Sequence, residues 1–340
     1  MSFGIINAVL GLSPIWYHLF SIVLHTLNVL VVFYFIKYLL YLSTKSTRKP
    51  QIPQNQHRTV AFITAFFFAI HPMQVGAVAW ISASKVLLYS LLFLWSLIFY
   101  MRYIDRRRWY YFLLSVMLFL VSFGAKEQTL ILPCCLIAID YFFWRDISSK
   151  KIIAEKPRFF IIALVLGFIE ISATNAIFHK LLTRFYYPLG QRIILANFVL
   201  IKYLAKLLVP FKLSESYPFP MAPGSALPVQ YYVYPVFVIA LLIFLYRCFK
   251  AGKYYIIFGA AFCILNLLLA LGIIPMARRA LMADRYVYIS TIGLFFVLTI
   301  TGINLFNRLH PDRQKAFLVL IGIYVVFLMA STGYYVHRWV

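Results

Sequence analysis

The stretch IILANFVLIKYLAKLLVP, residues 193–210, decides how the chain is arranged in a membrane. It is apolar enough to be read as a span, but Lys202 and Lys206 lie four residues apart and therefore share one face of a helix. Lysine near the centre of a span is costly, and Pro210 ends the apolar run. We therefore expect an amphipathic or re-entrant helix here.

The basic connectors that follow this stretch support the same interpretation. If residues 193–210 crossed the membrane, every later connector would change sides. The positive-inside rule places basic connectors in the cytoplasm. If residues 193–210 formed a span, six positive charges of these connectors would lie on the outer side of the membrane. These charges are Arg247, Lys250, Lys253, Arg308, Arg313 and Lys315.

The composition is typical of a polytopic membrane protein. Of the 340 residues, 64% are hydrophobic and 12% are charged, and the apolar residues form blocks long enough to cross a bilayer. The net charge of +23 points to basic cytoplasmic connectors, so we expect the lipid bilayer and not nucleic acid as a partner. The four cysteines lack metal-ligand spacing, and we expect neither a disulfide framework nor a metal site.

The apolar blocks predict an all-α polytopic fold, a bundle of about ten transmembrane helices plus the helix at 193–210. Because the sequence shows no internal repeat, one membrane domain covers residues 1–340. Both ends of the chain then face outward, as do segments 71–85, 179–231 and 275–286. The predicted spans are 15–41, 59–70, 86–101, 109–124, 128–143, 159–178, 232–246, 254–274, 287–306 and 316–336.

The outward segment 71–85 begins where an apolar run stops at His71 and Pro72, and it closes at Lys85. Proline lacks an N–H and clashes with the preceding turn, so it ends the helix and leaves His71 at the helix end. His71 and Lys85 are therefore candidate ligand-binding residues. An interfacial helix stop, with Trp80 as a membrane-belt aromatic, explains the same pattern.

Two charges lie in the tight outward turn AKEQ at 125–128. Lys126 is suited to hold an anion and Glu127 to orient a hydroxyl, although both also fit the description of solvated turn charges. Within the spans, Glu170 is a functional candidate because ionisable groups are rare in the bilayer. The polar stripe of His25 with its neighbours Ser21 and Asn28 is typical of helix packing instead.

Three arginines stand on the outer side in IPMARRALMADRYVYIST, residues 274–291, where the topology rule expects few basic residues. Arginine presents a planar fork of donors that suits phosphate, and two tyrosines beside the arginines suit a sugar. Anchoring to anionic lipid headgroups is the alternative explanation. The arginines predicted for a lipid phosphate are Arg278, Arg279 and Arg285, and the tyrosines beside them, predicted to contact a sugar, are Tyr286 and Tyr288.

Six collinear segments resemble one family, the transmembrane and tetratricopeptide-repeat-containing protein O-mannosyltransferases and their bacterial relatives, membrane glycosyltransferases of the GT-C type. The resemblance runs through nearly the whole chain. The segments are LGLSPIWYHLFSIVLHTLNVLVVF, FAIHPMQVGAVAWISASK, GAKEQTLILPCCLIAIDYFFW, YLAKLLVPFKLSESYPFP, IPMARRALMADRYVYISTIGLF and the final HRW.

The resemblance implies a polyprenyl-phosphate (dolichyl-phosphate) sugar as donor substrate, with mannose as the leading candidate for the sugar, and the sequence itself indicates no cofactor. Transfer would go to Ser or Thr of an acceptor protein on the extracytoplasmic face. Arg285, with Arg278 or Arg279, would bind the lipid phosphate, and Lys126 would assist. The motifs LMADRYVY and YPFP resemble the bacterial relatives and AKEQ resembles the eukaryotic ones, and of the two membranes we expect a bacterial inner membrane rather than an endoplasmic reticulum. The candidate catalytic carboxylates are Glu127, Glu215 and Asp284.

The chain departs from the family pattern at charged positions. Relatives carry a catalytic acid in the first outer loop and tetratricopeptide repeats after the final motif, whereas residues 1–14 contain no Asp or Glu. Where relatives read HPVHTEAVAWVSGRKD, this chain has Gly76, Ser84 and Val86 for Glu, Arg and Asp. We therefore expect the main base to precede Met1. The alternatives are a non-catalytic protein that binds a lipid-linked sugar and a transporter or flippase of a lipid-linked substrate.

Overall fold

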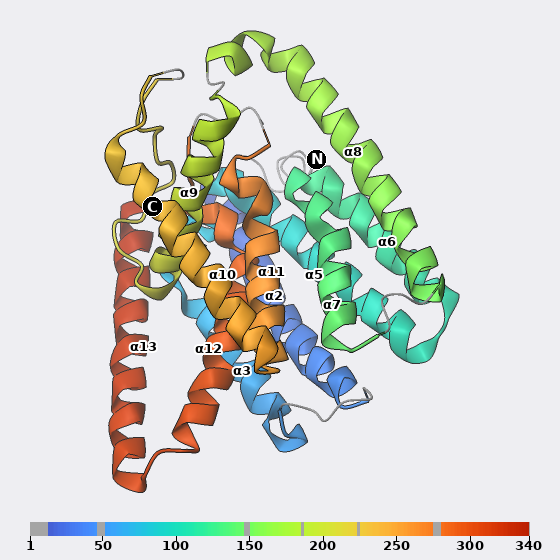
Figure 1. The fold of residues 1–340 in the computed structure, drawn as a ribbon, viewed down its shortest axis with the longest axis vertical. Coiled ribbons are helices and arrows are strands. Elements are labelled where there is room, and N and C mark those ends of the chain that lie inside the picture. The colour runs from blue at the N-terminus through green and yellow to red at the C-terminus, as the bar shows by residue number, and fades with distance from the viewer. Residues whose placement is uncertain are drawn as a thin grey trace.

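The computed structural model describes residues 13–45, 52–145, 150–184, 187–222, 225–274 and 280–339. Within them the chain is all-helical, as predicted, apart from loops and one isolated bridge between Tyr217 and Met282 (Figure 1). In chain order the helices are α2 (Pro14–Ser43), η1 (Gln54–Gln56), α3 (His57–Ile70), η2 (Pro72–Gln74), α4 (Val75–Val78), η3 (Ile81–Ala83), α5 (Ser84–Arg106), α6 (Trp109–Ala125), η4 (Glu127–Ile131), α7 (Leu132–Phe142), α8 (Lys150–Arg184), α9 (Leu189–Leu208), η5 (Val229–Val233), α10 (Tyr234–Lys250), α11 (Tyr254–Leu268), η6 (Leu269–Leu271), η7 (Asp284–Val287), α12 (Ser290–Phe306) and α13 (Pro311–Trp339).

Five of the described helices are long and apolar enough to cross a membrane. A sixth candidate is the pair Gln54–Ile70 and Pro72–Val78, which is bent by 57° at the expected helix stop. Two further predicted spans fall on α6 and α12, which are apolar but shorter. The structure therefore supports a membrane protein with five or six candidate spans by length and composition. The five are Pro14–Ser43, Ile81–Arg106, Val229–Lys250, Tyr254–Leu271 and Pro311–Arg338.

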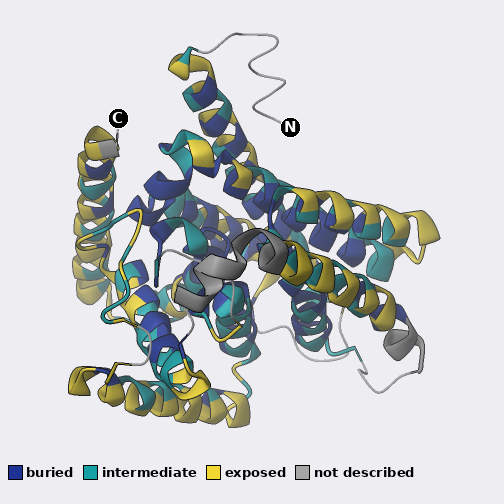
Figure 2. Cartoon of the chain, turned by 90° about the horizontal axis from the view of Figure 1, so that it is seen from above, coloured by how far each residue is buried: buried dark blue, intermediate teal, exposed yellow. Residues whose placement is uncertain are grey.

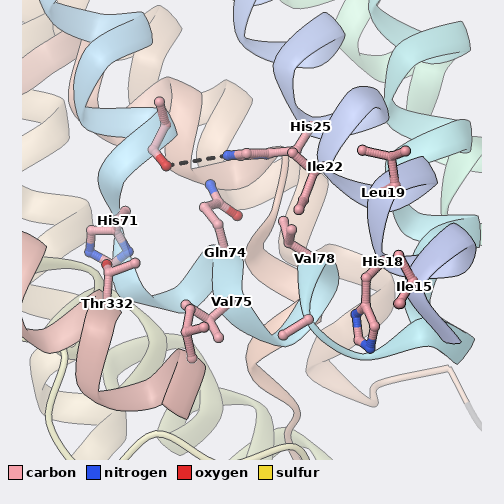
Figure 3. Close-up of a pocket in the computed structure, with 13 residues that line it drawn as sticks. Ile15, His18, Leu19, Ile22, His25, His71, Gln74, Val75, Val78 and Thr332 are labelled. Carbon is pink, nitrogen blue, oxygen red and sulfur yellow. Dashed lines mark hydrogen bonds between the residues drawn. The ribbon is translucent and has the colours of Figure 1, made fainter. Parts of the chain in front are cut away.

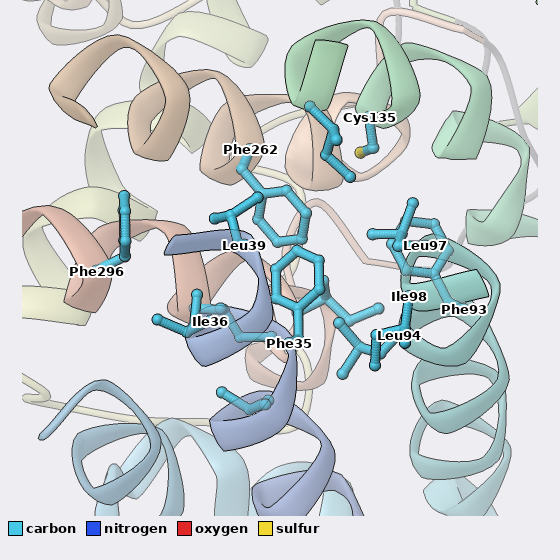
Figure 4. Packing of buried hydrophobic residues seen from close by; sticks show 14 of the residues in the cluster. Phe35, Ile36, Leu39, Phe93, Leu94, Leu97, Ile98, Cys135, Phe262 and Phe296 are labelled. Atoms are coloured by element: carbon cyan, nitrogen blue, oxygen red, sulfur yellow. The ribbon is translucent and has the colours of Figure 1, made fainter. Parts of the chain in front are cut away.

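The main hydrophobic core lies where α2 passes through the middle of the bundle (Figure 4). Phe35 and Leu39 of α2 are fully buried against α5, which contributes Phe93 and Leu97. Phe262 of α11 completes the contact, with its ring centroid 5.8 Å from that of Phe35. The apolar run of α2 is thus buried by protein at its centre, which explains why this helix holds several others together.

Two glycines allow α11 and α12 to approach each other closely. A Cβ atom built on Gly259 would lie 2.7 Å from the carbonyl oxygen of Gly293, and one built on Gly293 would lie 2.4 Å from that of Gly259. Any larger residue at either position would force the backbones apart. Small residues at a helix crossing are a common means of close packing between membrane helices.

Helix α9 covers most of residues 193–210, the stretch on which the predicted topology depends. Leu195, Val199, Tyr203 and Leu207 are buried and recur every four residues, so they form one stripe along the helix. Lys206 lies off this stripe and donates hydrogen bonds from Nζ to the carbonyl oxygens of two residues after the helix, each at 2.8 Å. The helix is amphipathic, as the spacing of its lysines predicts.

The outermost helices present most of their surface outward (Figure 2). Only 6% of the most apolar window is buried in both the α10 candidate span and the α13 candidate span. The turn that joins α12 to α13 lies at the lower end of the bundle in Figure 1. Apolar outer faces of this kind are what helices that contact lipid are expected to present.

Candidate functional site

The segment 281–287, which contains three of the predicted site residues, is fixed by backbone contacts. The Tyr203 hydroxyl accepts a hydrogen bond from the Ala283 N–H at 3.0 Å and donates one to the Ala283 carbonyl oxygen at 3.1 Å. Just before Ala283, the backbone N–H of Tyr217 donates to the Met282 carbonyl oxygen at 3.0 Å, and the Tyr217 carbonyl oxygen accepts from the Leu281 N–H at 2.9 Å. Helix η7 begins immediately afterwards and packs against η2, α4 and α11.

A row of alternating cationic and aromatic side chains lies beside η7. The guanidinium carbon of Arg285 lies 4.4 Å from the ring centroid of Trp80 and 5.1 Å from that of Tyr286. Nζ of Lys126 lies 4.9 Å from the centroid of the same Tyr286 ring and 5.7 Å from the centroid of the Tyr89 ring. We call Trp80, Arg285, Tyr286 and Lys126 the cationic row. It brings together Arg285 and Lys126, which the sequence predicts for a phosphate, and Tyr286, which it predicts beside them for a sugar.

The aromatic neighbours set the electrostatic character of this row. The face of an aromatic ring attracts cations, so Trp80 and Tyr286 hold the Arg285 guanidinium in place without neutralising its charge. Arg285 also donates from Nη1 to the carbonyl oxygen of Glu215 at 2.8 Å, which leaves further guanidinium donors for a ligand. Lys126 is only 5% exposed. Positive charge in such a place is suited to an anion such as phosphate.

Asp284 is the first residue of η7, is 2% exposed and binds the loop that follows α9. Its Oδ2 accepts a hydrogen bond from the backbone N–H of Ser214 at 2.6 Å, and its Oδ1 accepts one from the Tyr217 hydroxyl at 2.8 Å. Burial raises the pKa of Asp284 to about 7, although these hydrogen bonds and the charge of Lys206 oppose the rise. A carboxyl with such a pKa can exchange a proton near neutral pH, but both of its oxygens already have partners.

The other two candidate carboxylates occupy different environments. Glu127 opens η4 directly after Lys126 and is half-buried, so the chain itself places it next to the cationic row. Glu215 is exposed, and its backbone carbonyl rather than its side chain contacts Arg285. Of the three carboxylates, Glu127 is therefore the one that follows a residue of the cationic row directly in the chain and is also partly accessible to a substrate.

The hydrogen bonds of His71 are made with groups outside the cationic row. His71 is fully buried; its Nδ1 accepts a hydrogen bond from the Met73 N–H at 3.2 Å, and its Nε2 lies 3.1 Å from the Leu207 carbonyl oxygen. Both ring nitrogens thus stabilise the bend after α3, as the helix-stop interpretation expects. Lys85 is exposed in the first turn of α5.

Tyr288 turns away from the row, although it lies only three residues beyond Arg285. It is fully buried, its ring lies 5.0 Å from that of Phe68, and its hydroxyl lies 2.7 Å from Nδ1 of His25. Because Nε2 of His25 faces the Ala69 carbonyl oxygen at 3.2 Å, Nδ1 is the acceptor and Tyr288 the donor. Tyr288 therefore positions η7 against α2 and α3. The predicted residues Arg278 and Arg279 lie outside the described residues.

Sequence reasoning missed the partners that hold the site together. Trp80 was expected only as a membrane-belt aromatic, and Tyr203, Ser214 and Tyr217 were not singled out. The one available signal was the density of aromatic and small polar residues in LSESYPFP, next to the amphipathic helix. Among the described residues, no group of three or more His, Cys, Asp or Glu side chains could hold a metal ion.

A second cluster of charges lies far along α5 from the cationic row. Arg145 donates from Nη1 to Asp140 at 2.9 Å and from Nη2 to Glu155 at 3.1 Å, and Lys156 also pairs with Asp140. Tyr100 donates to both oxygens of Asp140, each at 3.0 Å. Among the described residues the charges in this cluster compensate one another, and the cluster ties α5, α7 and α8 together.

Comparison with known proteins gives similarity over part of the chain. Over 106 residues, 31% of this chain and 10% of the relative, it is 33% identical to protein O-mannosyl-transferase TMTC1 of Mus musculus. Over 96 residues, 28% of this chain and 9% of the relative, it is 35% identical to the Homo sapiens protein of that name. The chain thus matches about a tenth of the length of these curated relatives. No family model and no solved structure matches it. These findings support a partial relationship to the TMTC1 proteins.

Proposed function

We propose that this protein is a membrane glycosyltransferase that takes a sugar, with mannose as the leading candidate, from a polyprenyl-phosphate donor to Ser or Thr of extracytoplasmic proteins. The observation that carries the proposal is the cationic row, in which Arg285 and Lys126 meet at one tyrosine ring. The partial similarity to protein O-mannosyl-transferases supports the same reaction class. In this proposal the bundle has about ten spans of GT-C type and the row faces outward.

The proposed reaction needs positive charge at the leaving group and a base at the acceptor. The bond between the sugar C1 and the phosphate oxygen breaks, and C1 bonds to the acceptor hydroxyl oxygen. The polyprenyl phosphate leaves with the electron pair, and Arg285 and Lys126 stabilise its negative charge. The hydroxyl proton passes to a carboxylate. Among the described carboxylates Glu127 is the best placed base, whereas Asp284 positions η7 through its two hydrogen bonds.

A transfer assay with purified protein in lipid nanodiscs tests this assignment. With polyprenyl-phosphate mannose and a Ser/Thr-rich peptide, Glu127→Gln should lower turnover by about a hundredfold or more. Glu215→Gln serves as the matched control because Glu215 is exposed, and it should retain turnover. Retention of full activity by Glu127→Gln, Asp284→Asn and Glu215→Gln alike would exclude a described carboxylate as the base.

A second candidate function is binding of a lipid-linked sugar without transfer. The observation that favours it is that both oxygens of Asp284 accept hydrogen bonds within the protein. In that case the protein would bind the donor with the same dependence on Arg285 and release it unchanged. Mass spectrometry of donor and peptide after prolonged incubation separates the two functions, because only transfer yields a glycosylated peptide.

A further inference from the structure

A cavity of about 500 Å³ lies between α3, α12 and α13. We call it the α12–α13 cavity. Its wall is almost entirely carbon, from side chains such as Ile63 of α3, Leu298 of α12 and Ile321 of α13. Leu298 and Ile321 are also 38% and 37% exposed, so the cavity opens sideways onto the outer surface of the bundle. Its volume falls within the range of small-molecule sites, about 300 to 1,000 Å³.

Aromatic side chains of the wall close the cavity at both ends. Next to the turn that joins α12 to α13, the ring centroids of Phe306 and Phe317 are 6.1 Å apart. At the other end, the ring centroid of Phe67 lies 5.2 Å from that of Phe295 and 6.1 Å from that of Tyr324. The cavity is therefore a bounded space between helices.

Hydrogen bonds hold α13 at both ends of the same space. At the start of α13, Gln314 donates from Nε2 to the carbonyl oxygens of Phe306 and Leu309, each at 3.1 Å. Further along, the Tyr324 hydroxyl donates to the Leu208 carbonyl oxygen at 2.8 Å. The stretch of α13 between these two anchors lines the cavity, which leaves room there for a molecule from outside the chain.

Exposed cations surround the end of the cavity at the α12–α13 turn. Arg308 lies in the turn itself, and Arg313 and Lys315 lie near the start of α13. Helical residues three or four positions apart are neighbours on one face. Arg313 is therefore one turn from Phe317, and Lys315 is one turn from Leu318, and both of these apolar residues line the cavity.

Helix α3 adds a fourth cation at this end. It runs antiparallel to α12, since the Thr64 hydroxyl donates to that of Thr299 at 3.5 Å and Phe67 stacks on Phe295. Arg58 precedes Thr64 by six residues and is exposed, so it is level with the end of α12. The cation comes from a third helix of the cavity wall.

Little negative charge offsets these four cations. The sequence of α3, α12, α13 and the turn between the last two contains one acidic residue, Asp312, and its Oδ2 lies 3.3 Å from Nδ1 of His310. The sequence also predicts that this turn is cytoplasmic, where the membrane leaflet carries negative charge. Basic pockets between membrane helices on that side are suited to anionic lipid headgroups.

The length of the cavity matches one leaflet of a membrane. Arg313 and Tyr324 are eleven residues apart in α13, which is about 17 Å at 1.5 Å per residue. Half of the hydrocarbon core of a bilayer is about 15 Å thick. A lipid whose phosphate lies level with Arg313 would therefore reach Tyr324 with its hydrocarbon chain.

We propose that the α12–α13 cavity binds an acyl chain of an anionic phospholipid whose phosphate lies among Arg58, Arg308, Arg313 and Lys315. The bound lipid fills the space between α12 and α13 and so stabilises α13 on the bundle. This inference goes beyond the proposed function and does not depend on it, because none of these residues belongs to the cationic row.

Two glycine variants test the cavity. A Cβ atom on Gly302 would lie 3.8 Å from the Phe317 ring, an ordinary contact, so Gly302→Leu should fold while it fills part of the cavity. Native mass spectrometry in detergent should show that its affinity for phosphatidylglycerol is about threefold to tenfold lower, because the acyl chain loses packing contacts. Ile321→Phe fills the cavity from α13 and should give a similar loss. The matched control is Gly322→Leu, since a Cβ there meets nothing within 4 Å.

Two charge variants test the headgroup. Replacing both Arg313→Gln and Lys315→Gln should lower the affinity for phosphatidylglycerol by about tenfold or more. The affinity for phosphatidylcholine, which has no net charge, should stay the same. The control combines Arg247→Gln and Lys250→Gln, two exposed cations in the last turn of α10, and should keep the preference for phosphatidylglycerol.

A second cavity, of about 510 Å³, provides a further control (Figure 3). It lies between the start of α2, the η2–α4 turn and the last turns of α13, and Figure 3 shows His25, His71 and Gln74 in its wall. None of its described wall residues belongs to the α12–α13 cavity. Ile22→Phe narrows this second cavity and should leave the affinity for phosphatidylglycerol unchanged.

Three results would overturn the proposal. The first is equal affinity of Gly302→Leu and Gly322→Leu for phosphatidylglycerol, which would show that the cavity does not hold the lipid. The second is a loss in Gly302→Leu with no effect of the Arg313 and Lys315 variant, which would show that the headgroup charge is not recognised. The third is a loss of undecaprenyl phosphate but not of phosphatidylglycerol in Gly302→Leu, because the occupant would then be an isoprenoid lipid. None of these results bears on donor binding that depends on Arg285.

Discussion

The Arg285 guanidinium carbon lies 4.4 Å from the centroid of the Trp80 ring, although the two residues are far apart in the sequence. Trp80 ends the turn that follows the bent pair α3–α4, and Arg285 belongs to η7. The contact therefore joins segments 71–85 and 275–286, which are predicted to face outward and which carry most of the predicted site residues. It also orients an arginine without neutralising it, which is what an anion site requires.

Removal of the Trp80 ring should loosen the site without unfolding the protein. Trp80→Ala deletes a cation–π contact of about 0.5 to 2 kcal/mol, so affinity for undecaprenyl phosphate should fall by a few-fold to about thirtyfold. Trp80→Phe should recover part of this loss. Trp109→Ala is the control, because Trp109 is 73% exposed at the start of α6. Titration of both alanine variants tests this; equal affinities would show that Trp80 does not orient Arg285.

Asp284 should make stability depend on pH. Because burial raises its pKa from 3.8 to about 7, the folded protein holds this proton more tightly than the unfolded chain does. Its stabilising contribution is full below the ordinary pKa and is lost as the pH rises through about 7, for a total of roughly 4 kcal/mol.

The corresponding measurement is a thermal unfolding series from about pH 4 to pH 8 in detergent. The unfolding temperature of the wild type should fall across this range, and Asp284→Asn should flatten the curve because it cannot titrate. Glu215→Gln, at an exposed position, should leave the slope unchanged. A variant curve parallel to the wild-type curve would contradict the assignment.

Arg145 should be essential for the junction of α5, α7 and α8. Arg145→Met leaves Asp140 and Glu155 without their shared guanidinium partner, so stability should fall by about 3 to 5 kcal/mol. Arg106→Met is the matched control, since the Arg106 side chain is 71% exposed and should contribute little. Denaturant unfolding in mixed micelles measures both variants, and equal losses would refute a specific role for the cluster.

The crossing of α11 and α12 should not tolerate a side chain. Gly293→Ala would place a Cβ 2.4 Å from the Gly259 carbonyl oxygen and should destabilise the protein by about 1 to 3 kcal/mol. Gly322→Ala in α13 meets nothing within 4 Å and should be neutral or slightly stabilising. If thermal unfolding gave the two variants the same temperature, the close approach would not exist in the protein.

Local patterns predicted the helices but not the contacts between them. The helix stop at His71 and Pro72 and the amphipathic helix at 193–210 follow from proline geometry and from lysine spacing, and both are found. The number of spans was harder to predict from the sequence, because short apolar helices such as α6 and α12 have the composition of a span without its length.

The candidate site was predicted only in part, because local sequence patterns do not encode contacts between helices. Arg285, Tyr286 and Lys126 were named from their charge or chemistry on the outer side, and they meet. Tyr288 was expected to join them, but its hydroxyl pairs with His25, a contact between residues 263 positions apart. No local periodicity encodes which side chain of a short helix will turn inward, nor that Ser214 and Tyr217 will bind Asp284.

The central claim is that Arg285 binds the phosphate of a lipid-linked sugar, and the most direct test is the affinity of Arg285→Ala for undecaprenyl-phosphate mannose in nanodiscs of neutral lipid. Loss of a charge-assisted contact should weaken binding by about tenfold to a hundredfold. A higher salt concentration should reduce this difference in affinity between Arg285→Ala and the wild type. Arg247→Ala, an exposed arginine in the last turn of α10, should bind like the wild type. Identical affinities for Arg285→Ala and Arg247→Ala would contradict the account.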